Sequence, residues 1–160
     1  MAKYEDLLVE FESYGRSADG VKPLMQHISD RLHDEMTRYN WVGFYFMEAP
    51  KFEALVLGPY AGSFMPTLRI PLDRGLCGAA ATSGKTVVVN DVKADPRYLG
   101  SDLVKSNLVV PIFVKKSEVK KKVVAELCIE SYFGNTFPPP EQKFLESCAA
   151  LVGRYMEQEG

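Results

Sequence analysis

The sequence predicts an α+β fold in which a six-stranded antiparallel sheet carries helices from both ends of the chain on one face. Amphipathic helical spacing dominates the two ends, whereas the middle holds short β-branched and aromatic runs that follow one another without long helices between them. Such consecutive strands favour an antiparallel sheet, and the terminal helices are expected to cover one face. We expect loops to cover the other face and to enclose a small-molecule pocket there.

Length and composition fit a single domain spanning residues 1–160. The chain is 46% hydrophobic and 25% charged, which excludes disordered, collagen-like and coiled-coil classes. A formal net charge of -2 gives no electrostatic reason to expect a nucleic-acid partner. No apolar run is long enough to span a membrane, and the N-terminus lacks a signal-peptide pattern. We therefore expect a cytoplasmic protein with no membrane partner.

Two amphipathic helices are predicted before the first strand. Residues 1–15 have apolar side chains at helical spacing, and this helix is expected to end at Gly15. The second helix is expected to begin at Val21 and to end near Asn40, with Pro23 tolerated in its first turn. Its predicted apolar face consists of Val21, Leu24, Met25, Ile28, Leu32 and Met36.

Six strands are expected in the middle of the chain. The first two form a hairpin, and Gly58-Pro59 is expected to end the second of them. The last two flank a lysine-rich connection at residues 115–122, which is either an exposed hairpin tip that discourages edge pairing or a surface for an anionic partner. The expected strands span residues 41–47, 52–57, 67–70, 86–89, 108–114 and 123–131.

Two further helices complete the expected fold. A short Ala-rich helix over residues 76–82 is closed by Gly84, and a final amphipathic helix begins at residues 138–140. The string from Gly78 to Thr86 is not a P-loop, because its Gly-Lys-Thr end leads into a strand and not into a helix.

No metal site or cofactor is expected. His27 and His33 are six residues apart and therefore lack the helical spacing of a zinc-binding pair, and the sequence has no Cys-x-x-Cys motif. The three cysteines are an odd number and cannot form a closed disulfide framework. Cys148 lies on the apolar face of the last helix and is expected to be a buried structural thiol.

Cys77 has two interpretations. It follows Arg74 at the start of the short helix, where helix N–H groups and a nearby cation would lower its pKa. Alternatively, Cys77 is a small residue that fills a tight contact between helix and sheet. Both interpretations stay open at this point.

Alternation along the last strand places Cys128 and Glu130 on the opposite face from Leu127 and Ile129. If the two apolar residues face the helices, Cys128 and Glu130 face the pocket. A mid-strand carboxylate such as Glu130 must be paired or must bind something, because burying it alone is costly.

Trp41 and Tyr45 share one face of the first strand and are separated on that face only by Gly43. They either pack in the core or frame a small apolar or sulfur-bearing group.

Three segments carry a resemblance to a known family: Asn40-Trp41-Val42-Gly43-Phe44-Tyr45, residues 55–62 and residues 69–78, which include Cys77. In order and spacing they resemble the GAF-domain enzymes called free methionine-(R)-sulfoxide reductases, and residues 110–131 fit as well. The resemblance implies a six-stranded antiparallel sheet with helices on one face and a ligand pocket on the other. It also implies cysteine attack on the sulfoxide sulfur, with thioredoxin reducing the resulting disulfide.

The resemblance assigns roles to four residues. Cys77 matches the family's resolving cysteine, and Trp41 and Tyr45 match the aromatic residues that line the substrate side chain. Glu130 stands where the family has an aspartate, which keeps a carboxylate for a substrate ammonium group.

This sequence departs from the family pattern at four positions. The attacking cysteine and the aspartate after it fall at Gly100 and Ser101, and neither residue attacks sulfur as a thiolate. A family glutamate becomes Asn107, and a strand aspartate becomes Cys128. We expect these losses to weaken amino-acid binding.

The leading hypothesis is a stand-alone GAF domain that binds a small molecule through Trp41, Tyr45, Asn107, Cys128 and Glu130 without the reductase chemistry. The second hypothesis is a redox enzyme in which Cys128 attacks a sulfoxide, Cys77 resolves the product, and thioredoxin is the reductant. It requires the two Cα atoms to lie within about 7 Å. The third hypothesis is an interaction module that forms a homodimer through the terminal helices.

Overall fold

The computed structural model describes residues 2–49, 51, 53–64, 66–98 and 100–159. The strands form one antiparallel sheet in the order β3-β2-β1-β6-β5-β4. They are β1 (Trp41–Met47), β2 (Ala54–Gly62), β3 (Arg69–Pro71), β4 (Val87–Val89), β5 (Ser106–Lys115) and β6 (Lys121–Ser131). The helices are α1 (Ala2–Ser17), α2 (Val21–Glu35), α3 (Gly75–Ser83) and α4 (Pro139–Glu159), with a 3-10 turn at Val92–Ala94.

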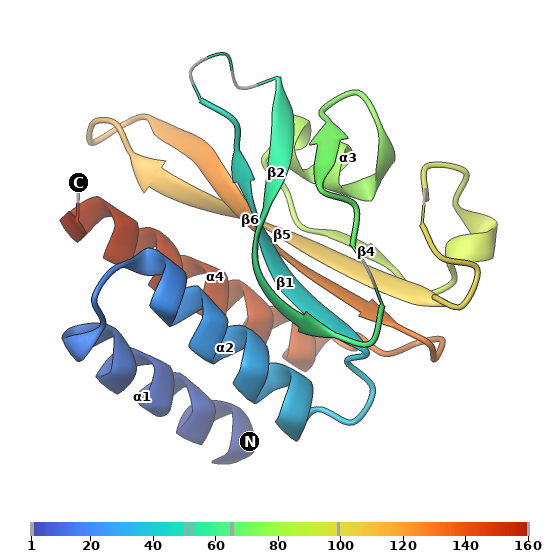
Figure 1. Cartoon of the computed structure of the whole chain (residues 1–160), viewed down its shortest axis with the longest axis horizontal. Coiled ribbons are helices and arrows are strands. Elements are labelled where there is room, and N and C mark those ends of the chain that lie inside the picture. Colours follow the sequence, from blue (N-terminus) through green and yellow to red (C-terminus); the bar gives the residue numbers. More distant parts are fainter. Residues whose placement is uncertain (1, 50, 52, 65, 99, 160) are drawn as a thin grey trace.

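Helices from both ends of the chain cover one face of the sheet. Figure 1 shows α1, α2 and α4 gathered on that face, while α3 and the connection that follows β4 lie on the other side. The predicted α+β class and layer arrangement are confirmed. No helix in the described part of the chain has the length and apolar character needed to cross a membrane.

The core between the helices and the sheet is built from the apolar faces that the helical spacing predicts. Four α2 side chains of the predicted face, Leu24, Met25, Ile28 and Leu32, are fully buried, and Cys148 of α4 is fully buried among them. Apolar burial of this kind is the main force that holds the helical layer on the sheet.

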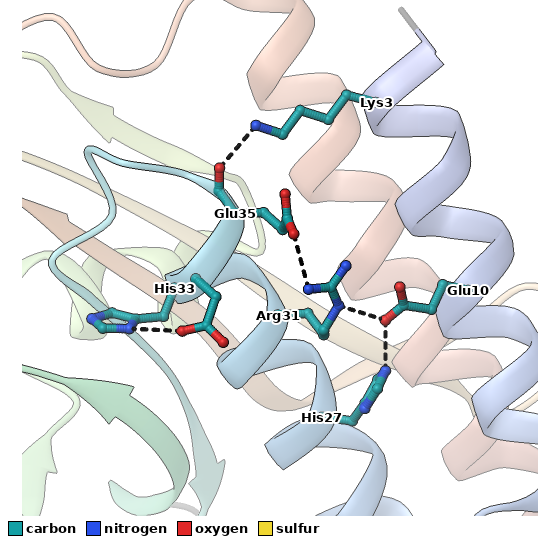
Figure 2. A network of polar contacts seen from close by, with 7 residues as sticks. Lys3, Glu10, His27, Arg31, His33 and Glu35 are labelled. Atoms are coloured by element: carbon teal, nitrogen blue, oxygen red, sulfur yellow. Dashed lines mark hydrogen bonds and ion pairs between the residues drawn. The ribbon is translucent and has the colours of Figure 1, made fainter.

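A polar network joins α1 to α2 (Figure 2). Glu10 Oε2 lies 2.7 Å from His27 Nε2 and accepts a 2.9 Å hydrogen bond from Arg31 Nε. Arg31 also donates to Glu35 Oε1 at 3.0 Å, and Lys3 Nζ donates to the Glu35 carbonyl oxygen at 2.8 Å. The Arg31 guanidinium holds the pKa of the Glu10 carboxyl below its ordinary value. The network fixes how α1 lies against α2.

Two helix ends differ from the prediction. The first helix continues through Gly15 to Ser17, and a side chain at Gly15 would lie against Leu24 and Tyr155. The second helix ends at Glu35, well before Asn40. Met36 is already extended, and its N–H caps the helix by donating to the Leu32 carbonyl oxygen.

The second strand also differs from the prediction, since it passes through Gly58-Pro59 to Gly62. The register with β1 shifts there: Gly43 pairs with Tyr60, but Tyr45 pairs with Leu57. This irregularity is a β-bulge, one of the few places in a sheet that accept a proline without losing a ladder hydrogen bond.

The lysine-rich connection is the exposed end of the β5–β6 hairpin. Lys115, Lys116, Lys120 and Lys121 are exposed, and the Lys116 N–H donates to the Lys120 carbonyl oxygen at 2.8 Å. The exposed-tip interpretation therefore agrees with the geometry of the hairpin.

Candidate functional site

A cavity of about 460 Å³ lies on the sheet face opposite the terminal helices. This volume falls within the range of about 300 to 1,000 Å³ that is typical of small-molecule sites. Its walls come from the sheet, from α3, and from the connections on either side of β3 and after β4. All six candidate residues line it: Trp41, Tyr45, Cys77, Asn107, Cys128 and Glu130.

Strand pairing brings the candidate residues from β1, β5 and β6 together. Glu130 lies directly between Trp41 of β1 and Asn107 of β5, and Cys128 pairs with Gly43. Leu127 belongs to the core under the helices, whereas Cys128 belongs to a second apolar cluster on the pocket face. The predicted alternation of β6 is therefore confirmed.

Aromatic side chains form one wall of the cavity. The ring centroids of Trp41 and Tyr45 lie 6.1 Å apart, and the Trp41 ring stacks on Tyr60 at 5.5 Å and on Phe64 at 6.2 Å. The Tyr45 hydroxyl donates to the Thr67 carbonyl oxygen at 3.0 Å, and burial raises the pKa of Tyr45. This wall is rigid and mostly apolar.

The polar wall centres on Glu130. Its Oε1 lies 3.3 Å from the hydroxyl of Tyr98, which also lies 3.3 Å from the Ser101 carbonyl oxygen. Burial raises the pKa of Glu130 to about 7, and the Tyr98 hydroxyl offsets part of that rise. Asn107 donates from Nδ2 to the Ile129 carbonyl oxygen at 2.8 Å, which fixes its amide against the base of the cavity. Glu130 is thus a carboxyl group that changes charge near neutral pH.

Of the two interpretations of Cys77, the one in which its pKa is lowered is wrong. A hydrogen bond to Cys128, followed by burial, raises the pKa of the Cys77 thiol well above its ordinary value. Arg74 cannot oppose this rise, because its side chain is 67% exposed and lies 3.8 Å from Asp73. Cys77 and Cys128 are 8% and 4% exposed, and both are free thiols.

Comparison with known proteins assigns the family. The GAF domain family model matches residues 21–156, which is most of the chain. The chain belongs to the GAF domain family. A relative with a curated description, protein YtsP of Bacillus subtilis (strain 168), is 32% identical over 157 residues, covering 97% of this chain and 91% of that protein.

This GAF domain is also related to free methionine-R-sulfoxide reductases at modest identity. The enzyme of Escherichia coli (strain K12) is 28% identical over 154 residues, covering 96% of this chain and 88% of the enzyme. The X-ray structure of the free methionine-R-sulfoxide reductase from Neisseria meningitidis, in complex with its substrate, superposes with a TM-score of 0.87 at 28% identity. That match covers 99% of this chain and 92% of the other.

Sequence reasoning missed Glu126, a carboxyl group behind the GAF pocket. It shares its strand face with Cys128 and Glu130 but is fully buried. Neither carboxyl oxygen has a partner at hydrogen-bonding geometry in the described part of the chain. Burial raises the pKa of Glu126 well above its ordinary value, and the Cys77 thiol offsets only part of that rise. Alternation along β6 is the signal that could have found it.

Tyr98 was also missed, because it lies in an irregular segment where no periodicity predicts a side chain's direction. Its ring occupies the space next to Gly100, where an added Cβ would lie 2.2 Å from the Tyr98 Oη. Non-bonded atoms do not approach this closely. Tyr98 therefore fills the region into which any side chain at position 100 would extend.

We expect Gly100→Ala to displace the Tyr98 ring and to break its contact with Glu130. The cost is about 1 to 2 kcal/mol of the free energy of unfolding, from overpacking and a lost hydrogen bond. Urea unfolding followed by circular dichroism measures this change. In a Tyr98→Ala background the same substitution should cost much less, since the obstructing ring is absent. Equal costs in both backgrounds would contradict the proposed clash.

No group of three or more His, Cys, Asp and Glu side chains is arranged to hold a metal ion within the described ranges of the chain. The side chains that line the cavity offer carboxyl, amide, thiol and aromatic groups.

Proposed function

We propose that this GAF domain binds a small molecule in the cavity between the Trp41–Tyr45 wall and Glu130, and that it does so without sulfoxide reductase chemistry. The observation that carries the proposal is the cavity itself. One rigid aromatic wall and one half-buried carboxyl group, that of Glu130, face the same space of about 460 Å³. Pockets that are mostly apolar with a few fixed polar groups are the usual form of small-molecule sites.

The chemistry of the walls favours a compact ligand with a positive group and an apolar or sulfur-bearing group. Glu130 supplies a carboxylate for an ammonium group, and the aromatic wall suits a methyl or thioether group. Arg74 lies at the exposed rim, where it adds positive charge for a ligand carboxylate. Free amino acids with a sulfur-containing side chain combine these features, and a related reductase has been crystallised with its substrate.

The glycine at position 100 supports the proposal of binding without turnover. The family resemblance places the attacking cysteine there, and this chain has glycine. Tyr98 occupies the adjoining space and contacts Glu130. An aromatic ring thus fills the place from which a nucleophile would reach the ligand.

Calorimetric titration of the reduced protein with methionine and with methionine (R)-sulfoxide tests the proposal. We expect affinity to rise between about pH 6 and about pH 8, because the Glu130 pKa of about 7 makes its carboxylate negative over this interval. Glu130→Gln should weaken binding by about tenfold or more and remove that pH dependence, since a charge-assisted hydrogen bond is lost. Absence of binding by either amino acid would refute this ligand class.

A thioredoxin-coupled assay tests the second candidate, a sulfoxide reductase that uses Cys128 and Cys77. The direct contact between these thiols in the pocket wall favours it. Turnover that disappears in both Cys77→Ser and Cys128→Ser would replace the binding-only proposal with this one. Homodimerisation through the terminal helices and a cytoplasmic location stay predictions.

A further inference from the structure

Two thiols and a carboxyl group meet at the base of the pocket. Cys77 comes from α3, and Cys128 and Glu126 come from β6. Cys77 and Cys128 pack in one buried cluster, and both side chains line the cavity, so a small solute in the cavity reaches them. The third thiol, Cys148, is fully buried in the core under the helices and belongs to the opposite face of the sheet.

The contacts distinguish the two sulfur atoms. Asn107 Nδ2 donates to Cys128 Sγ at 3.6 Å. Donors directed at a sulfur atom stabilise negative charge on it. A hydrogen bond to Cys128, then burial and the nearby carboxyl groups, raises the pKa of Cys77, so Cys77 is the protonated partner. We therefore assign the first attack to Cys128, which accepts the Asn107 hydrogen bond and lines the cavity.

Glu126 is the group placed to relay a proton from Cys77. It has no exposed surface, and its oxygens have no hydrogen-bonding partner in the described part of the chain. Its cross-strand neighbours are Tyr45 and Pro111, and proline has no N–H to donate. Leaving a buried carboxyl group without a partner is costly, so its retention next to two thiols points to a role in proton transfer.

We propose that Cys77 and Cys128 form a reversible disulfide when hydrogen peroxide enters the pocket, and that Glu126 is the buried acid–base group that serves the pair. The inference goes beyond the proposed ligand binding, because it needs only the two thiols and the carboxyl group.

The chemistry proceeds in two steps. The Cys128 sulfur attacks one peroxide oxygen, the O–O bond breaks, and Cys128 becomes a sulfenic acid while the departing hydroxide takes up the Cys128 proton and leaves as water. The Cys77 sulfur then attacks the Cys128 sulfur, forming the S–S bond and breaking the S–O bond. The Cys77 proton passes through Glu126 to the second departing hydroxide. Two thiols and one peroxide thus give one disulfide and two waters.

Other titratable groups face this cluster and belong in its pH response. Tyr45 lies on β1, Glu130 on β6, and Tyr98 approaches from the segment after β4. Of the two carboxyl groups, Glu126 is the one whose pKa the Cys77 thiol shifts through a hydrogen bond. The disulfide would covalently link α3 to β6 across the base of the pocket and change its lining.

The test is mass spectrometry of the full chain after hydrogen peroxide treatment and alkylation of the remaining thiols. We expect a loss of two hydrogens, a peptide linked through Cys77 and Cys128, and full reversal by dithiothreitol. Cys77→Ser and Cys128→Ser should abolish the link, whereas Cys148→Ala, the matched control in the core, should leave it unchanged. A link through Cys148, or no link between Cys77 and Cys128, would overturn the proposal.

Glu126→Gln tests the proton-transfer role, after circular dichroism has shown that the variant is folded. We expect disulfide formation at neutral pH to be about tenfold or more slower, because the carboxyl group that relays the Cys77 proton is lost. The pH dependence of the remaining rate should then reflect the ionisation of the thiols alone. Glu126→Asp keeps a carboxyl group and should recover part of the rate. It also allows the test if the glutamine variant does not fold. A pH profile of Glu126→Gln that superposes on the wild-type profile would overturn the role. The ligand titrations use reduced protein. A negative result for disulfide formation therefore leaves the proposed ligand binding untouched, and a negative titration leaves the disulfide proposal untouched.

Discussion

Replacing Glu126 with leucine is expected to raise the free energy of unfolding at neutral pH by about 3 kcal/mol, because an unpartnered buried polar group is removed and apolar area is gained. Glu126 has no exposed surface, and its two oxygens lack hydrogen-bonding partners within the described ranges of the chain. The surrounding residues on the pocket face are apolar, so leucine replaces the carboxyl group in surroundings that suit it. Urea unfolding at a fixed pH measures the gain.

The same substitution is expected to flatten the dependence of stability on pH. Burial raises the pKa of Glu126 above its ordinary value of 4.5. Below 4.5 the carboxyl group is protonated in both states, and its contribution to stability is fully present. As pH rises from there towards the folded pKa, the unfolded chain releases the proton first, and the free energy of unfolding falls by about 1.4 kcal/mol per pH unit.

Glu126→Gln is the matched control for this prediction. It removes the titration but keeps an unpartnered polar group, so it should flatten the pH dependence without the full gain in stability. In every variant Glu130 also makes the free energy of unfolding fall as pH rises, because its pKa is raised as well. The difference in the free energy of unfolding between wild type and Glu126→Leu should change between about pH 5 and about pH 8. A constant difference over this range would contradict the raised pKa of Glu126.

Trp41→Ala is expected to lower the free energy of unfolding by about 4 kcal/mol, which is typical of truncating a buried aromatic side chain. Trp41 is 1% exposed, and its ring fills space that two glycines leave open. A Cβ at Gly43 would lie 2.5 Å from Trp41 Cη2, and one at Gly62 would lie 2.3 Å from Trp41 Cδ1. Because those positions carry no side chains, nothing nearby can refill the void.

Chemical denaturation followed by far-UV circular dichroism measures the Trp41 effect. Trp41→Phe serves as the control, since it keeps an aromatic ring against Tyr60 and should cost less than half as much. The alanine variant should also lose ligand affinity, because the cavity loses its rigid wall. A cost below about 1 kcal/mol would show that the pocket collapses around the missing ring.

Much of the fold follows from periodicity in the sequence. The alternation of Leu127 and Ile129 with Cys128 fixes which face of β6 the helices cover, and the spacing of Leu24, Ile28 and Leu32 fixes the face of α2. The end of β2 was not predictable in this way. From the sequence alone, Gly58-Pro59 predicts the end of a strand. The bulge opposite Phe44 that lets the strand continue depends on pairing between strands.

In the candidate site, too, the residues on regular strands were predictable from the sequence and those in irregular segments were not. Trp41, Tyr45, Asn107, Cys128 and Glu130 lie on strands, and the structure brings all five to one cavity with Cys77. Tyr98 lies in an irregular segment, where tertiary packing alone sets the direction of the ring. The direction of the Cys77 pKa shift also depends on tertiary contacts, because Cys128 approaches it from a strand distant in sequence.

The wall of the cavity contains the only tryptophan in the sequence, Trp41. Its indole N–H is buried and has no hydrogen-bonding partner in the described part of the chain. Indole emission is sensitive to polarity and to nearby quenching groups, so the intrinsic fluorescence of this protein comes from a single reporter in the pocket wall. Filling the cavity, or joining the two thiols at its base, should therefore be visible as a change in emission without any added label.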